Sequence, residues 1–240
     1  MKYSIIIPYR NREEHLSILI PSLKKAFDGK EYEIVVAEQD NNEKFRLSML
    51  YNVAFGYTKG EQVIFHDVDY IPSDTVVYDM PDDNPYYPVK QVVFLAEDNA
   101  TPKRLEDIPA GYRHFHMDVG NHSGGVYVMK REVFEKLNGL NPLYVGWGKD
   151  DDDMRARIAR LGLKQVRGNG LFYALHHPDS GPSPTDPDFQ RNEEIFSHWW
   201  DFVGDGYRQS KADVVVMHPS DEEWNIVRWL RMTNFRVENK

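Results

Sequence analysis

The sequence predicts an α/β fold in which a mostly parallel central sheet is flanked by helices. Three short apolar runs, at residues 3–8, 31–37 and 62–65, alternate with two segments that carry apolar side chains at helical spacing, at residues 16–27 and 45–57. Short continuous apolar runs are typical of strands buried on both faces. The order strand, helix, strand, helix, strand indicates βαβ units, whose strands lie parallel.

The first helix has a start signal and a break signal of its own. Asn11 followed three residues later by Glu14 matches a capping box, so we expect Asn11 to be the N-cap. Pro21 lies inside the helical pattern and predicts a kink.

The rest of the chain has a weaker pattern. Prolines and acids are frequent at residues 73–113, where we expect irregular structure with one strand at 91–95. Beyond that segment, the pattern predicts strands at 124–129, 170–175, 214–217 and 226–230, helices at 130–137, 151–161 and 189–202, and a proline-rich loop at 178–187.

Composition limits the class of protein. The chain has 240 residues and no cysteine, which excludes disulfides, thiolate zinc sites and cysteine nucleophiles and fits a cytoplasmic protein. A net charge of −9 gives no general attraction for nucleic acid. Neither a signal peptide nor an apolar stretch near membrane length is visible, so we expect a soluble protein without a membrane span. It is either a whole cytoplasmic enzyme or a catalytic domain of a longer chain.

A pair of carboxylates follows the third apolar run. Asp67 and Asp69 are two residues apart at a strand end, so their side chains point the same way. Two hard oxygen ligands of this kind suit Mg²⁺ or Mn²⁺ and leave positions open for diphosphate oxygens. The alternative is that both residues simply belong to a turn after the strand.

A run of four acids begins the helix predicted at 151–161. Helix phase places Asp151 toward the protein body, with Asp150 beside the apolar face, and Asp153 on the solvent side with Arg157 and Arg160. An inward carboxylate is costly unless it meets a partner or a cleft. The alternative is that the acids only complement the helix macrodipole.

Trp147 lies between Gly146 and Gly148, just before the acids. The glycines allow the loop to move, and the indole suits stacking on a sugar ring, so we expect this loop to order over a bound donor before the acceptor binds. The alternative is a fixed core tryptophan whose neighbouring glycines relieve crowding.

A glycine pair, an arginine pair and a histidine pair give weaker signals for a binding site. Gly124 and Gly125 allow a phosphate or sugar to approach the backbone, or form a tight turn. Arg10 and Arg12 follow the first strand, where they suit a diphosphate or uridine as well as ordinary surface exposure.

His176 and His177 end the strand predicted at 170–175. One of them can complete a metal site through its neutral imidazole, whereas the alternative is a surface pair at a strand end.

The order of these segments resembles the β-1,4-galactosyltransferase family. The matching segments are residues 7–12 with 14–16, residues 52–55, residues 67–69 with 71–72, residues 124–126, residues 146–153 and a later histidine. The resemblance implies a GT-A fold, which is a Rossmann-like nucleotide-sugar-binding fold, in a soluble member of bacterial or viral type. One domain is expected at 1–240, in which residues 1–120 bind the nucleotide sugar and residues 121–240 bind the acceptor.

The resemblance also implies an inverting reaction. A hexose, galactose or N-acetylgalactosamine, is expected to move from a UDP-sugar to a glycan or another hydroxyl acceptor, with Mn²⁺ or Mg²⁺ as cofactor. The implied catalytic base is Asp151, and the implied metal ligands are Asp69 with His177, or alternatively His176. The residues implied at the donor are Pro8, Arg10, Arg12, Asp67, Gly124, Gly125 and Trp147. Those implied at the acceptor are Asp150, Asp152 and Trp147.

The sequence departs from the family pattern at several positions. Asp150 stands where the family has glutamate, and His122 stands where it has an aromatic residue tied to donor choice. Ala174 replaces a methionine metal ligand, so His176 or water must take its place, and residues 45–48 differ from the family's F-N-R-A segment.

Two other functions fit parts of the pattern. A metal-dependent phosphohydrolase also uses aspartates at strand ends, but it does not explain the segment around Trp147. A non-catalytic carbohydrate-binding module would use Trp147, Trp199 and Trp200 without UDP or metal.

Overall fold

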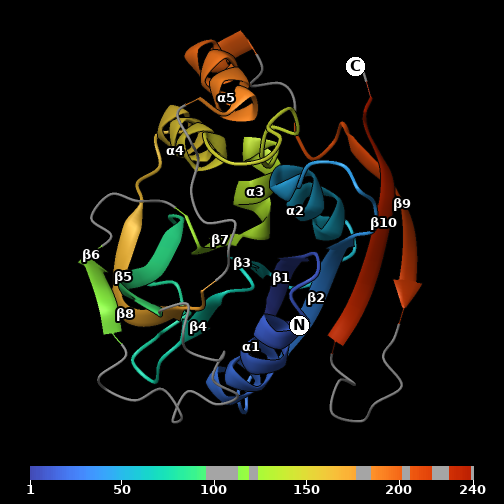
Figure 1. The fold of residues 1–240 in the computed structure, drawn as a ribbon. Coiled ribbons are helices and arrows are strands. Elements are labelled where there is room, and N and C mark those ends of the chain that lie inside the picture. The colour runs from blue at the N-terminus through green and yellow to red at the C-terminus, as the bar shows by residue number, and fades with distance from the viewer. Residues whose placement is uncertain (96–112, 119–123, 177–184, 202–205, 218–226, 239–240) are drawn as a thin grey trace.

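The computed structural model describes residues 1–95, 113–118, 124–176, 185–201, 206–217 and 227–238, and it shows one sheet with helices on both faces (Figure 1). The strands are β1 (Tyr3–Tyr9), β2 (Tyr32–Gln39), β3 (Gln62–His66), β4 (Tyr70–Pro72), β5 (Tyr86–Leu95), β6 (Arg113–Asp118), β7 (Val126–Lys130), β8 (Val166–Ala174), β9 (Ser210–Met217) and β10 (Val227–Val237). The helices are α1 (Glu13–Ala26), α2 (Leu47–Phe55), α3 (Arg131–Leu137), α4 (Asp150–Arg160), α5 (Pro187–Ser197) and a 3₁₀ turn at Trp199–Asp201. Within the described part of the chain, none of the helices has the length and apolar character that crossing a membrane requires.

The sheet has a parallel centre and antiparallel additions. Its order is β4-β8-β5-β7-β3-β1-β2-β10-β9, with β6 paired to β5. β1 lies parallel to both β2 and β3, and β10 lies parallel to β2, which confirms the predicted βαβ units. β7 runs antiparallel to β3, and β9 runs antiparallel to β10, so the sheet as a whole is mixed. The carboxyl ends of β1, β2 and β3 therefore meet at one edge.

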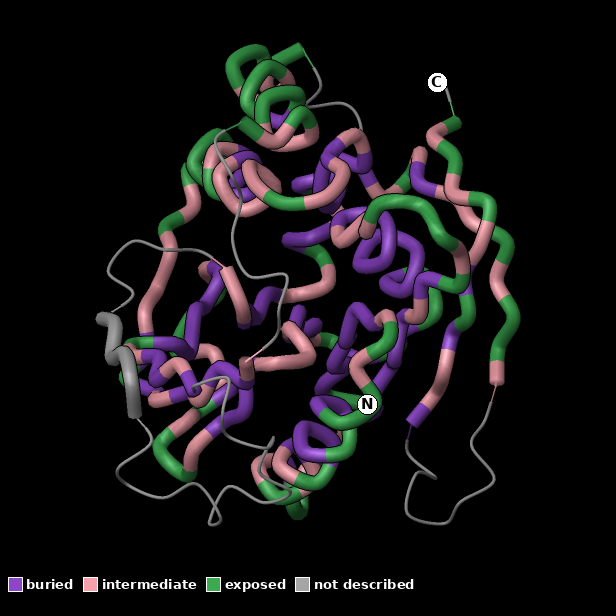
Figure 2. The backbone as a smooth tube through the Cα atoms, viewed as in Figure 1, coloured by how far each residue is buried: buried purple, intermediate pink, exposed green. Residues whose placement is uncertain are grey.

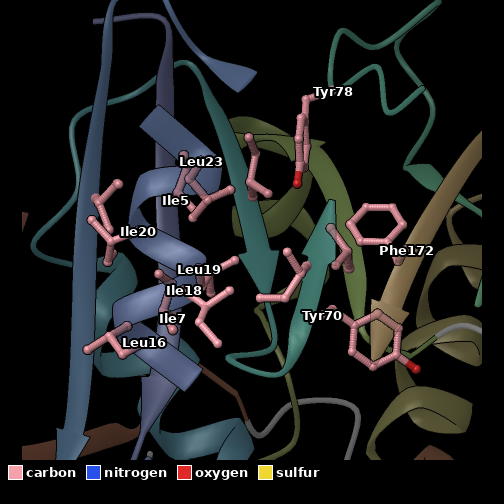
Figure 3. Close-up of a cluster of buried hydrophobic side chains, with 14 of the residues drawn as sticks. Ile5, Ile7, Leu16, Ile18, Leu19, Ile20, Leu23, Tyr70, Tyr78 and Phe172 are labelled. Carbon is pink, nitrogen blue, oxygen red and sulfur yellow. The ribbon is translucent and has the colours of Figure 1, made fainter. Parts of the chain in front are cut away.

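The core has two halves because side chains alternate across β1. Ile5 and Ile7 pack against α1, where Figure 3 shows Leu16, Leu19 and Leu23 facing them. Ile6 points to the other face, where apolar side chains of α2 and α3 cover the sheet. Figure 2 shows the buried residues in the middle strands and on the inner helix faces, whereas α5 is mostly exposed.

The predicted capping box is wrong. The N-cap of α1 is Arg12, no side chain caps the helix, and Asn11 has φ 51°. Asn tolerates this left-handed conformation, which the chain uses to turn from β1 into α1.

The segment predicted to be irregular contains a longer strand than expected. β5 runs from Tyr86 to Leu95, and its pairing with β8 shifts register on both sides of Val89. These irregularities accommodate Pro88, which cannot donate a ladder hydrogen bond. The short strand β4 and the strand β6 were not predicted.

The predicted phase of α4 is wrong for two residues. Asp153 and Arg157 are 0% and 1% exposed, and Arg157 Nε donates to Asp153 Oδ2 at 2.7 Å. Arg157 also donates to the carbonyl of Leu137 at 3.3 Å, so α3 covers this side of α4 and the buried arc is wider than the apolar residues indicate. Leu161 follows the end of the helix and is 43% exposed.

Candidate active site

The carboxylate pair lies at the end of β3, as predicted. The backbone N–H of Asp67 donates to the carbonyl of Gly125 at 2.8 Å, which joins this turn to the start of β7. Tyr51, from α2, donates its hydroxyl to Asp67 Oδ1 at 3.0 Å. Asp67 is thus held from two sides, while Asp69 lies two residues further along the same turn.

The end of β8 lies beside Asp69. The N–H of Leu175 donates to the carbonyl of Asp69 at 2.9 Å. The next residue, His176, is half-buried, and its carbonyl lies 3.1 Å from Nε2 of His15. His177 lies outside the described residues. The fold therefore brings the end of β8, with His176, next to Asp69, although the two segments lie far apart in the sequence.

The first turn of α4 adds two more carboxylates to this site. Burial, followed by repulsion from Asp69, Asp151 and Asp150, raises the pKa of Asp67 well above its ordinary value. Asp150 and Asp151 are half-buried, and the charges of both act on Asp67, which agrees with the predicted inward position of Asp151. These four residues, Asp67, Asp69, Asp150 and Asp151, are called the carboxylate cluster below.

Both α4 carboxylates have raised pKa values. Burial and then the charge of Asp151 raise the pKa of Asp150 to about 8. Burial and then the charge of Asp152 raise the pKa of Asp151 to about 6. These carboxylates repel one another when they ionise, and a bound cation would relieve that repulsion.

Asp152 differs from its neighbours. It forms ion pairs with Arg155 at 2.5 Å and with Lys149 at 3.5 Å, on the outer side of α4. Its carboxylate is therefore neutralised by basic partners, although its charge still acts on the neighbouring Asp151.

Three tyrosines that the sequence did not single out surround the cluster. Tyr51, Tyr70 and Tyr127 are buried, and burial raises their pKa values, with the negative charges of the cluster adding to the effect. The hydroxyl of Tyr127 is buried without a hydrogen-bond partner among the described residues. Aromatic residues in strands and helices are usual core residues, so no local pattern marked these three.

The glycine pair lies at the start of β7. Gly125 has φ 85°, and a Cβ there would lie 2.5 Å from Cε1 of Tyr70. Any larger residue would displace the Tyr70 ring, which explains the need for glycine at this position. Gly124 is half-buried beside it.

The residues after β1 emerge at the same edge. Pro8 is buried within β1, and Arg12 is half-buried. Nη1 of Arg10 donates to the carbonyl of Glu43 at 2.5 Å, and its guanidinium lies 5.3 Å from the ring centre of Phe45. Arg10, just after β1, is thus held against the segment between β2 and α2.

Trp147 is 55% exposed, so it is not the core residue of the alternative interpretation. Its ring centre lies 5.9 Å from that of Phe189 in α5. The preceding residue, Gly146, donates its N–H to the carbonyl of Phe45 at 2.8 Å, which connects this loop to the segment between β2 and α2.

The donor atoms fit a hard divalent cation. Carboxylate oxygens and imidazole nitrogen suit Mn²⁺, and the carboxylate cluster has an excess of negative charge. In the part of the chain that the structure describes, no three such residues are grouped closely enough to hold a metal by themselves. The predicted third ligand, His177, lies outside that part.

Two family models match the chain. One, described as the N-terminal region of glycosyl transferase group 7, matches residues 1–80. The other, described as the N-terminal domain of galactosyltransferase, matches residues 110–178. These ranges contain every residue of the carboxylate cluster.

Curated relatives and a solved structure agree with these matches. β-1,4-Galactosyltransferase 4 of Cricetulus griseus is 33% identical over 73% of this chain and 48% of its own length. A β-1,4-N-acetylglucosaminyltransferase of Lymnaea stagnalis is 33% identical over 75% of this chain and 35% of its own. The catalytic domain of Drosophila β-1,4-galactosyltransferase 7, solved with xylobiose, has a TM-score of 0.71 at 22% identity, covering 100% of this chain and 95% of that one. A mutant of that enzyme, solved with manganese, UDP-Gal and xylobiose, matches equally well.

The fold is that of the GT-A class of glycosyltransferases, since the solved galactosyltransferase structure matches it over the whole chain. The two family models together match well over half of the chain. The chain belongs to glycosyltransferase group 7, the β-1,4-galactosyltransferase family. It spans 35% to 48% of the length of the curated relatives described here.

Proposed function

We propose that the protein is an inverting, metal-dependent glycosyltransferase that moves a hexose from a UDP-sugar to an acceptor hydroxyl. The observation that carries this proposal is the carboxylate cluster, in which the end of β3 and the start of α4 bring together acids that repel one another. Membership of glycosyltransferase group 7 supports the reaction class.

The donor side of the site consists of strand ends. Asp69, together with His177 or alternatively His176, is proposed to hold Mn²⁺ or Mg²⁺, which would neutralise the diphosphate leaving group when bound. Asp67, fixed by Tyr51, lines the nucleotide site. Pro8, Arg10 and Arg12 are proposed to bind the nucleotide, and Gly124 and Gly125 to let the donor approach the backbone.

The acceptor side consists of α4 and the loop before it. Asp151 is proposed to accept the proton of the acceptor hydroxyl while that oxygen attacks the anomeric carbon from the face opposite the diphosphate. One displacement converts an α-linked donor into a β-glycoside. Asp150 and Asp152 are proposed to orient the acceptor, and Trp147 to cover both sugars.

The sugar is proposed to be galactose or N-acetylgalactosamine, and the acceptor a glycan or another hydroxyl compound. Four curated β-1,4-galactosyltransferases from rodents and humans are 32% to 34% identical, which supports galactose. The Lymnaea relative is a β-1,4-N-acetylglucosaminyltransferase, so a test must include that donor sugar as well.

The location of the protein and the division of the chain into a donor half and an acceptor half are also proposals. A cytoplasmic location is supported by the absence of cysteine. The division into a donor half at 1–120 and an acceptor half at 121–240 is supported by the positions of the proposed site residues. The relatives described above are animal proteins and give no support to a bacterial or viral type.

The deciding experiment is a screen of UDP-sugars with an acceptor panel, in Mn²⁺, in Mg²⁺ and in chelator. We expect transfer only with metal, and calorimetry should show metal-dependent UDP binding that Asp69→Ala abolishes. Equal UDP affinity in chelator and in Mn²⁺ would remove the metal site. Hydrolysis without transfer to any acceptor would favour the phosphohydrolase, and sugar binding that needs neither UDP nor metal would favour the binding module.

A further inference from the structure

We propose that Asn192 of α5 is a positioning residue that fixes residues 145–149, called the Trp147 loop, and thereby places Trp147 beside the carboxylate cluster. The inference rests on the proposed function for its effect on the reaction. The contacts that carry it are independent of that function.

The side chain of Asn192 is fully buried and bonded only to the Trp147 loop in the described contacts. Its Nδ2 donates to the carbonyl of Val145 at 2.9 Å and to the carbonyl of Trp147 at 3.2 Å. Its Oδ1 accepts the N–H of Val145 at 3.3 Å. An amide offers two N–H donors and an acceptor oxygen, and this backbone segment uses all of them.

Asn192 is unusual for its helix. It is the one buried residue of α5, whose other side chains are exposed or half-buried (Figure 2). A surface helix normally anchors itself with apolar side chains, because burying a polar group costs free energy unless it is hydrogen-bonded. The amide therefore indicates that this contact fixes a particular backbone geometry rather than only burying surface.

The shape of the loop matches α5 as well. A Cβ on Gly146 would lie 3.4 Å from Asp188, and a Cβ on Gly148 would lie 3.0 Å from the Phe189 ring. Both glycines have positive φ, at 73° and 101°. Both glycines thus give the loop a backbone conformation that other residues rarely adopt, and Gly148 also leaves room for the Phe189 ring.

Ion pairs join α5 both to the Trp147 loop and to the segment between β2 and α2. Lys149 pairs with Glu193 at 2.6 Å, and Lys44 pairs with Asp188 at 2.9 Å. These pairs are partly exposed and contribute little by themselves. The buried amide of Asn192 lies between them and is the contact on which the arrangement depends.

The consequence for the reaction follows from chain connectivity. α4 begins at Asp150, the residue after the Trp147 loop, and its N-cap Lys149 has φ 75°. A shift of the loop would therefore move Trp147 and the first turn of α4 together. The proposed metal and diphosphate contacts on β1 and β3 lie outside α5 and should be less affected.

The test compares the wild type with Asn192→Ala, with Asn192→Leu and with Glu194→Ala. Leu keeps the branched shape of Asn but has no hydrogen-bonding atoms. Glu194 is exposed on the same helix and is the matched control. Hydrogen exchange of a peptide covering the Trp147 loop is measured first, because the N–H of Val145 is itself bonded to Asn192.

We expect both Asn192 variants to lose protection in this peptide and the control to keep it. With UDP-sugar and Mn²⁺, both variants should show an acceptor KM raised about tenfold, the order expected for losing buried hydrogen bonds. Donor hydrolysis should rise relative to transfer, while UDP affinity by calorimetry stays within about threefold. Retained UDP binding also shows that the variants are folded.

Three results would overturn the proposal. The first is unchanged exchange in Asn192→Ala, and the second is wild-type behaviour of Asn192→Leu, which would show that packing alone matters. The third is lost protection with no change in acceptor KM or in the hydrolysis ratio. If the wild type transfers no sugar, the proposed function fails, while the exchange measurement still decides whether Asn192 fixes the loop.

Discussion

At the scale of single residues, Asp151 combines two properties that a general base needs. It lies in the first turn of α4 beside the other members of the carboxylate cluster, where a reacting group could reach it. Burial and the charge of Asp152 raise its pKa to about 6, close to the pH at which it would work. A carboxylate with this pKa is still ionised at neutral pH, but it is a stronger base than an exposed aspartate.

The first prediction replaces Asp151 by Asn. The variant should keep its fold and its UDP affinity but lose about 10²-fold or more in turnover, the usual scale for removal of a general base. Initial rates of transfer at saturating donor measure the effect. Asp213→Asn, at an exposed ion pair with Arg236, is the control and should behave as the wild type. Wild-type turnover in Asp151→Asn would mean that another residue is the base.

The second prediction concerns pH. Only the ionised form of Asp151 can accept a proton, and its pKa is raised to about 6. At saturating Mn²⁺, kcat/KM should therefore fall about tenfold per pH unit below pH 6 and level off above about pH 7. The residual activity of Asp151→Asn should lack this acidic limb. An unchanged limb in the variant would assign it to another group.

At the scale of elements, the turn from the glycine pair into β7 depends on close packing. The third prediction compares Gly125→Ala with Gly162→Ala. Both positions have positive φ, at 85° and 71°, so each substitution carries a backbone cost of about 1–2 kcal/mol. Only the Cβ at Gly125 meets a neighbour within 4 Å, the ring of Tyr70.

Gly125→Ala should therefore be less stable than Gly162→Ala by a further 1–3 kcal/mol, about the cost of overpacking a core. Urea unfolding of both variants gives the difference. Equal losses would show that the Tyr70 ring can move aside without cost.

The fourth prediction concerns the buried ion pair of α4. Arg157→Met would leave the carboxylate of Asp153 buried without its partner and should cost about 3–5 kcal/mol. The double variant Asp153→Leu, Arg157→Met should recover most of this loss, because it removes the unpaired charge as well. Urea unfolding of the two variants measures both effects. A double variant as unstable as the single one would mean that the pair also holds α3 and α4 together.

Helices and strands could be predicted where the pattern of their own side chains reflects which of their faces are buried. β1, β2 and β3 are apolar because both faces of the sheet are covered, and α1 shows helical spacing because one face packs on the sheet. The phase of α4 was wrong because α3 covers it from the side, which the sequence of α4 does not record. β4, with three residues, is too short to produce a periodic pattern.

At the scale of the whole molecule, the site is assembled from distant segments. The turn after β3 is hydrogen-bonded to the start of β7 and to the end of β8, and the charges of the first turn of α4 act on Asp67 there. The sequence predicted the carboxylate cluster because each half has a local signal, a strand end or a helix start. It did not predict Tyr51, Tyr127 or Asn192, because their roles arise only from contacts between segments far apart in the chain.

The fifth prediction removes β9 and β10. β10 pairs with β2 and buries Val227, Leu230 and Met232, although no proposed site residue lies in it. A chain ending after Asp201 should therefore expose the edge of β2, precipitate and fail to bind UDP. A chain ending after Val237 is the control. Soluble protein with wild-type UDP affinity after the larger truncation would show that β2 is stable without this partner.

The pairing of β2 with β10 also has a consequence during synthesis. β2 is complete at Gln39, but its parallel partner begins at Val227. At ribosomal speeds of about 5–20 residues per second, the apolar edge of β2 waits roughly 10–40 s for that partner. Neighbouring nascent chains on one messenger present the same unpaired edge at the same time. Yield should therefore depend on translation speed and on chaperones that cover this strand, before any property of the finished protein matters.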